Sequence, residues 1–201
     1  MINRHIEESI ALQKTLLSDG SFSDAFGKAT QALYECLHKG GKLLIGGNGG
    51  SAAQAQHFAA EFVGRYDKLE RRAHSALALN VDTSILTAWS NDYHFDLVFA
   101  RQVEAHGRKG DVFIGLSTSG NSKNIIEALR VAKAAGLTTV TFLGKDGGHA
   151  KGLADVELIV PSKSTPHIQE IHTILIHALT AAVEARLHNA AGANDPKVQL
   201  A

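Results

Sequence analysis

The stretch KLLIGGNGGSAAQAQHFAAEFV, residues 42–63, decides the fold. It opens with a short apolar run at residues 42–46, passes through a glycine-rich loop and continues as a helical pattern over residues 51–63. A short apolar strand that leads through glycines directly into a helix is typical of a strand–helix–strand unit. The stretch therefore predicts an α/β fold whose sheet begins near residue 42.

The same alternation continues toward the C-terminus. Further strands are expected at residues 75–79, 112–116, 139–143 and 156–160, and further helices at residues 95–106, 123–135 and 169–187. The expected strands are apolar throughout and are separated by helices. Such strands belong to a parallel sheet that is covered on both faces.

The two ends of the chain differ from this core. Residues 1–40 read as two helices. In the first, Ile2, Ile6, Ile10 and Leu17 recur at helical spacing, and the second is capped by Ser23 and runs to residue 37. Neither belongs to a strand–helix–strand unit, so we expect both to pack outside the sheet, against a partner subunit. The predicted division is an N-terminal helical oligomerisation segment at 1–40, an α/β domain at 41–190 and a flexible tail at 191–201.

Composition narrows the class of protein. With 201 residues and 44% hydrophobic residues, the chain can bury the core of one ordinary domain. Its 20 basic and 20 acidic residues give no net charge, which argues against nucleic acid or an anionic membrane as a partner. Cys36, the single cysteine, is expected to be a buried helical residue. The N-terminus has no signal-peptide pattern and no apolar run approaches about 20 residues, so a cytoplasmic location is expected.

Two loops follow predicted strands and lead into helices. One reads Gly-Gly-Asn-Gly-Gly-Ser at residues 46–51 and the other Ser-Thr-Ser-Gly-Asn-Ser at residues 117–122. Glycines let backbone N–H groups approach a ligand, a helix N-terminus favours an anion, and hydroxyls can donate to phosphate oxygens. Neither loop matches a P-loop or G-x-G-x-x-G. One such loop is equally well explained as a tight turn with a good helix cap, and Ser51 and Gln54 have capping-box spacing. Two loops at equivalent strand ends favour a phosphate site.

Two helices carry candidate proton-transfer or metal-binding groups. His57 and Glu61 are four residues apart and lie on one helix face, although such a pair is more often a solvated surface pair. The last helix carries Gln169, Glu170, His172 and His177. Gln169 and His177 are separated by about 12 Å along a regular helix, so a shared small ion would require them to lean together. A lone histidine such as His177 is usually a satisfied core residue.

Taken in order, the motifs resemble the phosphoheptose isomerases of the sugar isomerase (SIS) domain family. The resemblance covers nearly the whole chain and rests on residues 47–51, 57–61, 64–66, 91–92, 117–122, 144–148, 168–170 and 176–177. It implies a three-layer αβα sandwich with a five-stranded parallel sheet, assembled as a homotetramer. One departure is His167, where an Arg commonly precedes Ile-Gln-Glu.

The resemblance also implies a reaction and a set of site residues. The reaction would convert sedoheptulose 7-phosphate to D-glycero-D-manno-heptose 7-phosphate, the first step toward the heptose of bacterial lipopolysaccharide. One Zn²⁺ per subunit would be bound by His57, Glu61, Gln169 and His177. The substrate contacts would be Asn48, Gly49, Gly50, Ser51, Glu61, Arg65, Asn91, Asp92, Ser117, Thr118, Ser119, Ser122 and Gln169.

Ketose-to-aldose isomerisation requires a base for the carbon acid and an acid for the developing oxyanion. Glu61 is the candidate base and His177 the candidate acid. Two alternatives remain: a non-catalytic tetrameric relative that binds the bacterial replication initiator, and another phosphosugar enzyme or sensor. The initiator-binding relative lacks the acidic base and the final histidine, so the presence of both favours the enzyme. The loops would fit any compact phosphosugar and do not discriminate.

Overall fold

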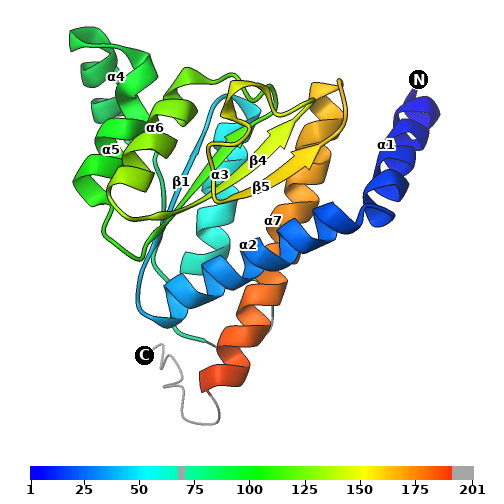
Figure 1. The fold of residues 1–201 in the computed structure, drawn as a ribbon, viewed down its shortest axis with the longest axis horizontal. Helices are drawn as coiled ribbons and strands as arrows, with labels where there is room; N and C mark the ends of the chain where they lie inside the picture. The colour runs from blue at the N-terminus through cyan, green and yellow to red at the C-terminus, as the bar shows by residue number, and fades with distance from the viewer. Residues whose placement is uncertain (68–70, 192–201) are drawn as a thin grey trace.

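A computed structural model of the chain describes residues 1–67 and 71–191. Its single sheet has the order β2-β1-β3-β4-β5, with every neighbouring pair parallel (Figure 1). The strands are β1 (Leu43–Gly47), β2 (Ala76–Ala78), β3 (Val112–Ser117), β4 (Thr138–Gly144) and β5 (Val156–Val160). All five predicted strands are therefore confirmed, and each observed end lies within one residue of its predicted position.

Seven α-helices are described. They are α1 (Ile2–Leu17), α2 (Gly20–His38), α3 (Gly50–Val63), α4 (Thr83–Asp92), α5 (Val98–His106), α6 (Lys123–Ala134) and α7 (Thr165–Ala191). Short 3₁₀ turns occupy Phe95–Leu97 and Gly148–Ala150. The helix predicted at residues 95–106 is thus a 3₁₀ turn followed by α5.

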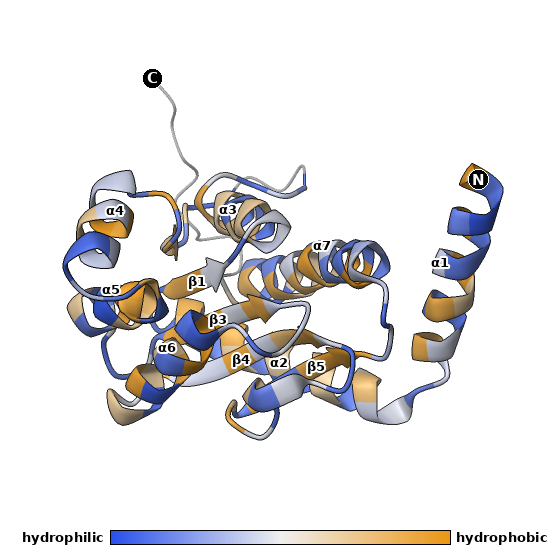
Figure 2. Ribbon diagram, turned by 90° about the horizontal axis from the view of Figure 1, so that it is seen from above, coloured by the Kyte–Doolittle hydropathy of each residue, from blue (hydrophilic) through white to orange (hydrophobic). Residues whose placement is uncertain are grey.

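Alternate residues of the strands belong to two different apolar clusters, one on each face of the sheet. Leu43 and Ile45 of β1 pack with buried residues of α2, α3 and α7, whereas Leu44 packs with those of α5 and α6. Because consecutive side chains of a strand point to opposite faces, a strand that is apolar throughout supplies both layers of core. Helices lie on both sides of the sheet (Figures 1 and 2), which confirms the three-layer αβα sandwich.

The second helix differs from its prediction in two ways. It begins at Gly20, because the carboxylate of Asp19 accepts hydrogen bonds from the backbone N–H groups of Ser21 and Phe22, so Ser23 is not its cap. It also packs on the sheet: Leu33 and Leu37 are fully or almost fully buried in the cluster that contains β1. The expectation that both N-terminal helices lie outside the sheet is therefore wrong for α2. Cys36, also on α2, is buried as predicted.

Two further helices differ from expectation. Helix α4 was not predicted from the sequence, and its N-terminus is capped by the Asp82 carboxylate. The last helix begins at Thr165, four residues earlier than predicted, with Pro166 in its first turn. Proline fits there because the first turn of a helix needs no hydrogen bond from its nitrogen.

The first helix lies at one side of the molecule (Figure 2), where it contacts α2 and α7. Its partly buried Leu12 and buried Leu16 join the apolar cluster, while its other side carries exposed isoleucines. An oligomerisation role for residues 1–40 stays a prediction. The predicted tail lies outside the described residues from position 192 onward. Within the described parts of the chain, no helix combines the length and apolarity needed to span a membrane.

Candidate active site

The two loops lie side by side at the carboxyl edge of the sheet. Strands β1 and β3 are direct neighbours, with Gly47 paired to Leu116, so the loops that follow them start at adjacent points. The first loop leads into α3 after Gly49, and the second leads into α6 after Ser122. Two helix N-termini thus open beside one another at the edge where open α/β sheets bind ligands.

An amide pair joins the two loops. The side chains of Asn48 and Asn124 donate to one another, each over 2.9 Å. Asn124 is 3% exposed and was not among the predicted site residues. It is the second residue of α6, and an asparagine so near a helix start is ordinarily explained by local capping, so the sequence did not mark it as a site residue.

The second loop is held by its own hydroxyls and by a neighbouring loop. The hydroxyls of Ser117 and Ser122 are 3.0 Å apart, and the Ser119 hydroxyl accepts from the backbone N–H of Asn121. Gly120 has φ +67° and packs so closely on the Gly147 carbonyl that a Cβ would overlap with it. Only glycine fits that backbone conformation and that contact together.

No capping box forms at the first loop. The N-cap of α3 is Gly49, without a side-chain cap, and Ser51 is buried. The Gln54 amide instead donates across to α7, to the backbone carbonyl of Gln169 at 2.7 Å and to the Thr173 hydroxyl at 2.9 Å. Gln54 therefore ties α3 to α7.

Three of the four predicted metal ligands come together between α3 and α7. His57 Nε2 lies 2.9 Å from a Glu61 carboxylate oxygen and 3.2 Å from His177 Nε2. One donor atom from each of the three side chains lies within 4.8 Å of the others. The side chains of His57 and Glu61 are 43% and 20% exposed, so the cluster is accessible to a ligand. The ring of Tyr66 stands 5.8 Å from that of His177.

Gln169, the fourth predicted metal ligand, lies on α7 away from this cluster. Its amide packs on Gly50, where a Cβ would overlap with Nε2 of Gln169. Gly50 is the first residue of α3, seven residues before His57, which corresponds to roughly 10 Å along the helix. Since α7 is one continuous α-helix, the separation of Gln169 from His177 expected from the sequence persists. Gln169 therefore lies at the end of the first loop, and its role as a metal ligand stays a prediction.

Three predicted substrate contacts lie apart from the loops. Arg65, Asn91 and Asp92 are exposed, and in residues 1–67 and 71–191 none of them is hydrogen-bonded to either loop. Asn91 donates to the Asp92 carboxylate at the end of α4. Their assignment to the substrate site stays a prediction.

A buried ion pair supports the C-terminal end of α3. The guanidinium of Arg71 binds the Glu184 carboxylate of α7, and both side chains are 2% exposed. Arg71 also donates to the backbone carbonyls of Glu61 at 2.7 Å and of Phe62 at 2.9 Å. These are carbonyls of a helix end, which have no partner within the helix. This pair could not be recognised from spacing or motif, since its members are 113 residues apart.

Comparison with known proteins agrees with this geometry. A model of the SIS domain matches residues 5–144. The phosphoheptose isomerase of Geobacter sp. (strain M21) is 53% identical over 186 residues, covering 92% of this chain and 93% of the relative. That of Helicobacter pylori (strain Shi470) is 54% identical over 179 residues, covering 89% and 91%.

Solved structures give the same result. Phosphoheptose isomerase from Neisseria gonorrhoeae superposes with a TM-score of 0.84 at 42% identity, covering 92% of this chain and 97% of the other. The enzyme from Francisella tularensis gives 0.87 at 34% identity, covering 92% and 96%. With its five-stranded parallel sheet, its paired loops and its His–Glu–His cluster, the chain belongs to the phosphoheptose isomerases of the SIS-domain family.

Proposed function

We propose that this chain converts sedoheptulose 7-phosphate to D-glycero-D-manno-heptose 7-phosphate, the step that begins bacterial heptose biosynthesis. One observation carries the proposal: two adjacent loops of an anion-binding kind lie at the start of α3, and the same helix carries His57 and Glu61, which cluster with His177 of α7. A phosphate held at the loops leaves a sugar chain to extend along α3, because His57 and Glu61 lie two to three turns beyond Gly50.

In this proposal Glu61 and His177 move the protons. Glu61 removes the proton from C1, beside the carbonyl, which gives an enediolate with its charge on O2. The hydroxyl proton of O1 passes to O2 and His177 gives a proton to C2, which leaves an aldehyde at C1 and a hydroxyl at C2. Carbon acids adjacent to a carbonyl need a positioned base together with stabilisation of the developing oxyanion. His57 is adjacent to both groups and orients them. The hydroxyls of Ser117, Thr118, Ser119 and Ser122 and the backbone of Gly49 and Gly50 hold the phosphate.

The His–Glu–His cluster also fits a zinc ion. Two imidazoles and a carboxylate are ordinary zinc ligands, and their donor atoms lie within 4.8 Å of one another. His57, Glu61 and His177 would hold the ion, with Gln169 as the further ligand expected from the family. Bound there, zinc would polarise the substrate carbonyl. A carboxylate held tightly by a metal is a weaker base, so Glu61 would be only loosely held during turnover.

The assembly proposed is a homotetramer, with residues 1–40 contributing to the subunit contacts. Exposed isoleucines on α1 support this part of the proposal. The cytoplasmic location expected from the sequence likewise stays a prediction.

The non-catalytic alternative is a tetrameric relative that binds the replication initiator. It is not favoured, because such a protein needs neither Glu61 nor His177, and here both side chains point into one cluster. Another phosphosugar isomerase remains the nearer competitor, since the loops recognise a phosphate whatever sugar carries it.

The test is an isomerase assay on sedoheptulose 7-phosphate with added zinc and with chelator. Wild type should form product, while E61Q and H177Q should each lower kcat by at least about 100-fold and still bind the substrate's phosphate. The control variant H106Q changes an exposed histidine at the end of α5 and should match wild type. Product formation from a different phosphosugar but not from this one would overturn the proposed substrate.

A further inference from the structure

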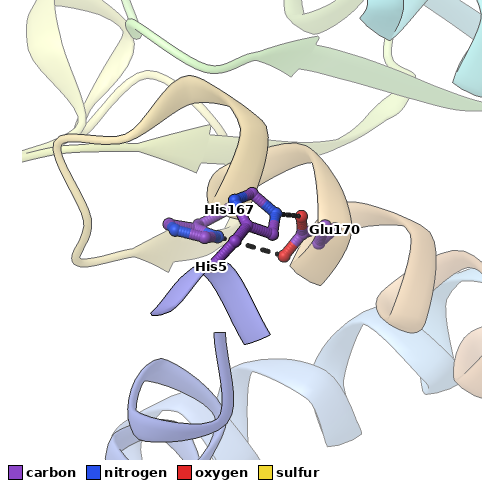
Figure 3. Close-up of side chains that lie close together, drawn as sticks. All are labelled: His5, His167 and Glu170. Carbon is purple, nitrogen blue, oxygen red and sulfur yellow. Dashed lines mark hydrogen bonds and ion pairs between the residues drawn. The ribbon is translucent and has the colours of Figure 1, made fainter. Parts of the chain in front are cut away.

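A second histidine–carboxylate cluster lies where the N-terminal helix meets α7. It consists of His5 on α1 and of His167 and Glu170 on α7 (Figure 3). His5 Nε2 is 2.6 Å from one Glu170 oxygen, and His167 Nδ1 is 3.1 Å from the other. The two imidazole rings lie 4.3 Å apart. None of these residues has a part in the proton transfer proposed above.

We propose that this cluster binds a zinc ion that fastens α1 to the start of α7. One donor atom of each residue lies within 4.8 Å of the other two. Zinc is bound by nitrogen and oxygen at about 2.0–2.1 Å, so the donor atoms of a tetrahedral site stand roughly 3.3 Å apart. Two of the present separations are near that spacing: 2.6 Å between His5 Nε2 and one Glu170 oxygen, and 3.1 Å between His167 Nδ1 and the other. A fourth position is left for water.

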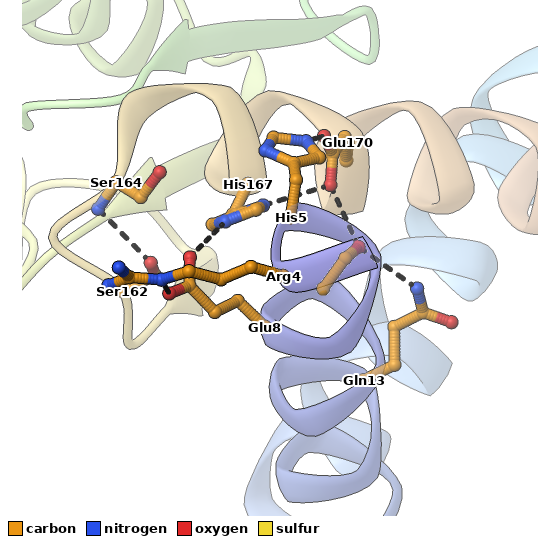
Figure 4. A network of polar contacts seen from close by, with 9 residues as sticks. Arg4, His5, Glu8, Gln13, Ser162, Ser164, His167 and Glu170 are labelled. Atoms are coloured by element: carbon orange, nitrogen blue, oxygen red, sulfur yellow. Dashed lines mark hydrogen bonds and ion pairs between the residues drawn. The ribbon is translucent and has the colours of Figure 1, made fainter. Parts of the chain in front are cut away.

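The groups around the cluster have the arrangement that supports zinc ligands. The second nitrogen of His167, Nε2, faces the Glu8 carboxylate at 3.3 Å, and the Ser9 hydroxyl donates to Glu170 at 2.8 Å (Figure 4). A carboxylate on the far nitrogen of a ligating histidine fixes its tautomer and leaves the near nitrogen free to bind a metal. The hydrogen bond from Ser9 likewise fixes the orientation of the Glu170 carboxylate.

The cluster combines two imidazoles with a carboxylate and is open to solvent on one side, which suits a cation. His5 and Glu170 are 44% and 37% exposed as side chains, so an ion can reach them, whereas His167 is 7% exposed and held in place.

The position gives the site a structural consequence. Residue 169 precedes Glu170, and its side chain packs on Gly50, where the first loop ends and α3 begins. An ion bound by His5 and Glu170 would therefore fix the first helix next to the turn of α7 that carries Gln169. The apolar side of α1 would be held in one orientation as a result.

Zinc stoichiometry tests the proposal and separates it from zinc in the active site. Purified chain would be stripped with chelator, dialysed against zinc and assayed for metal per chain. Wild type should bind two ions, H5A one, H57A/H177A one and H5A/H57A/H177A none. H106A, which removes a histidine outside both clusters, should still bind two.

The outcomes distinguish the two sites. If no zinc binds at the active site, wild type and H57A/H177A should both bind one ion and H5A should bind none. The present proposal stands in that case. It is overturned if H57A/H177A binds no zinc, or if H5A binds as much as wild type, because the cluster is then only a hydrogen-bonded contact.

Affinity supplies a second measurement in the H57A/H177A background. E8Q keeps the three ligands and removes the charge beside His167 Nε2, so zinc should bind about 10-fold more weakly than in the parent. K14Q, which neutralises an exposed charge elsewhere on α1, should leave the affinity unchanged. Equal affinity of E8Q and its parent would contradict the proposed role of Glu8.

Discussion

At the scale of single residues, His172 shows how a conspicuous polar residue of α7 serves the core. Its ring has no exposed surface, lies edge-on to Phe142 and places Nε2 3.2 Å from the Leu143 carbonyl. Burial lowers the pKa of His172 to about 4 from 6.5, and the hydrogen bond to Leu143 only partly opposes this effect. A histidine that must stay neutral inside the protein makes stability depend on pH.

The sign of that dependence follows from the two pKa values of His172. Above pH 6.5 the imidazole is neutral in both states, so its contribution to stability is complete. Between pH 6.5 and about 4 the unfolded chain takes up the proton and the folded one does not, so the free energy of unfolding falls as the pH falls. Across the whole interval the loss is on the order of 3 kcal/mol.

Urea unfolding of the metal-free protein at several pH values between 4 and 7.5 measures this effect. H172Q keeps a donor for the Leu143 carbonyl but cannot titrate, so its stability should vary less with pH than that of wild type. H106Q alters an exposed histidine and should keep the wild-type slope. A slope for H172Q equal to that of wild type would mean that His172 is not the group responsible.

Some residues of the candidate site could be predicted from their spacing in the sequence, and others could not. His57 and Glu61 were predictable as neighbours because residues four apart on a helix share a face. The approach of His177 to them was expected only from the family resemblance, because it depends on how α7 packs against α3. Asn124 and Arg71 were missed, since each acts through a partner distant in the sequence.

At the scale of secondary-structure elements, the strands were the most predictable part. A buried parallel strand is a short, continuous apolar run bounded by turn residues, and all five such runs form strands. Helix α4 was missed because it is short, has no fully buried residue and is rich in Ser and Thr. The burial of α2 against the sheet could not be read from connectivity, because a helix outside the strand–helix–strand units can still cover an open face.

The Arg71–Glu184 pair links the elements that carry the proposed acid and base. Arg71 binds the carbonyl of Glu61, and Glu184 lies two turns after His177 on α7. Removing one partner leaves a buried charge unpaired, so R71M should lower the free energy of unfolding by about 3–5 kcal/mol. The kcat should fall more than the KM rises, because the phosphate loops are at the other end of α3.

Urea unfolding of R71M, E184L and R71M/E184L provides the thermodynamic cycle. The double variant replaces the ion pair by two apolar side chains. Its loss of unfolding free energy should be smaller than the sum of the two single losses, with an interaction free energy above about 1 kcal/mol. The exposed pair formed by Arg101 and Glu104 provides the matched control, since R101M should cost less than about 1 kcal/mol. Similar losses for R71M and R101M would contradict a supporting role for Arg71.

At the scale of the whole molecule, the surface of α1 is too apolar for a free helix. Ile2, Ile6 and Ile10 are 66%, 47% and 44% exposed, and they recur every four residues along one side. A pocket between α1, α2 and α7 adds further apolar surface, lined in part by Phe22, Ile171 and Ile174. Contiguous exposed apolar surface of this kind marks a protein contact.

The proposed homotetramer therefore makes a prediction about α1. I6E/I10E places two charges on the apolar side without disturbing the monomer, because both side chains are already exposed. A11E/T15E adds the same charge at exposed positions on the side of α1 turned away from Ile6 and Ile10, and serves as the control. Light scattering after gel filtration should give a mass near four chains for wild type and for the control, and a smaller assembly for I6E/I10E. Circular dichroism should match wild type in both variants, since neither isoleucine is buried in the core of the chain. An unchanged mass for I6E/I10E would place the subunit contacts elsewhere on the molecule.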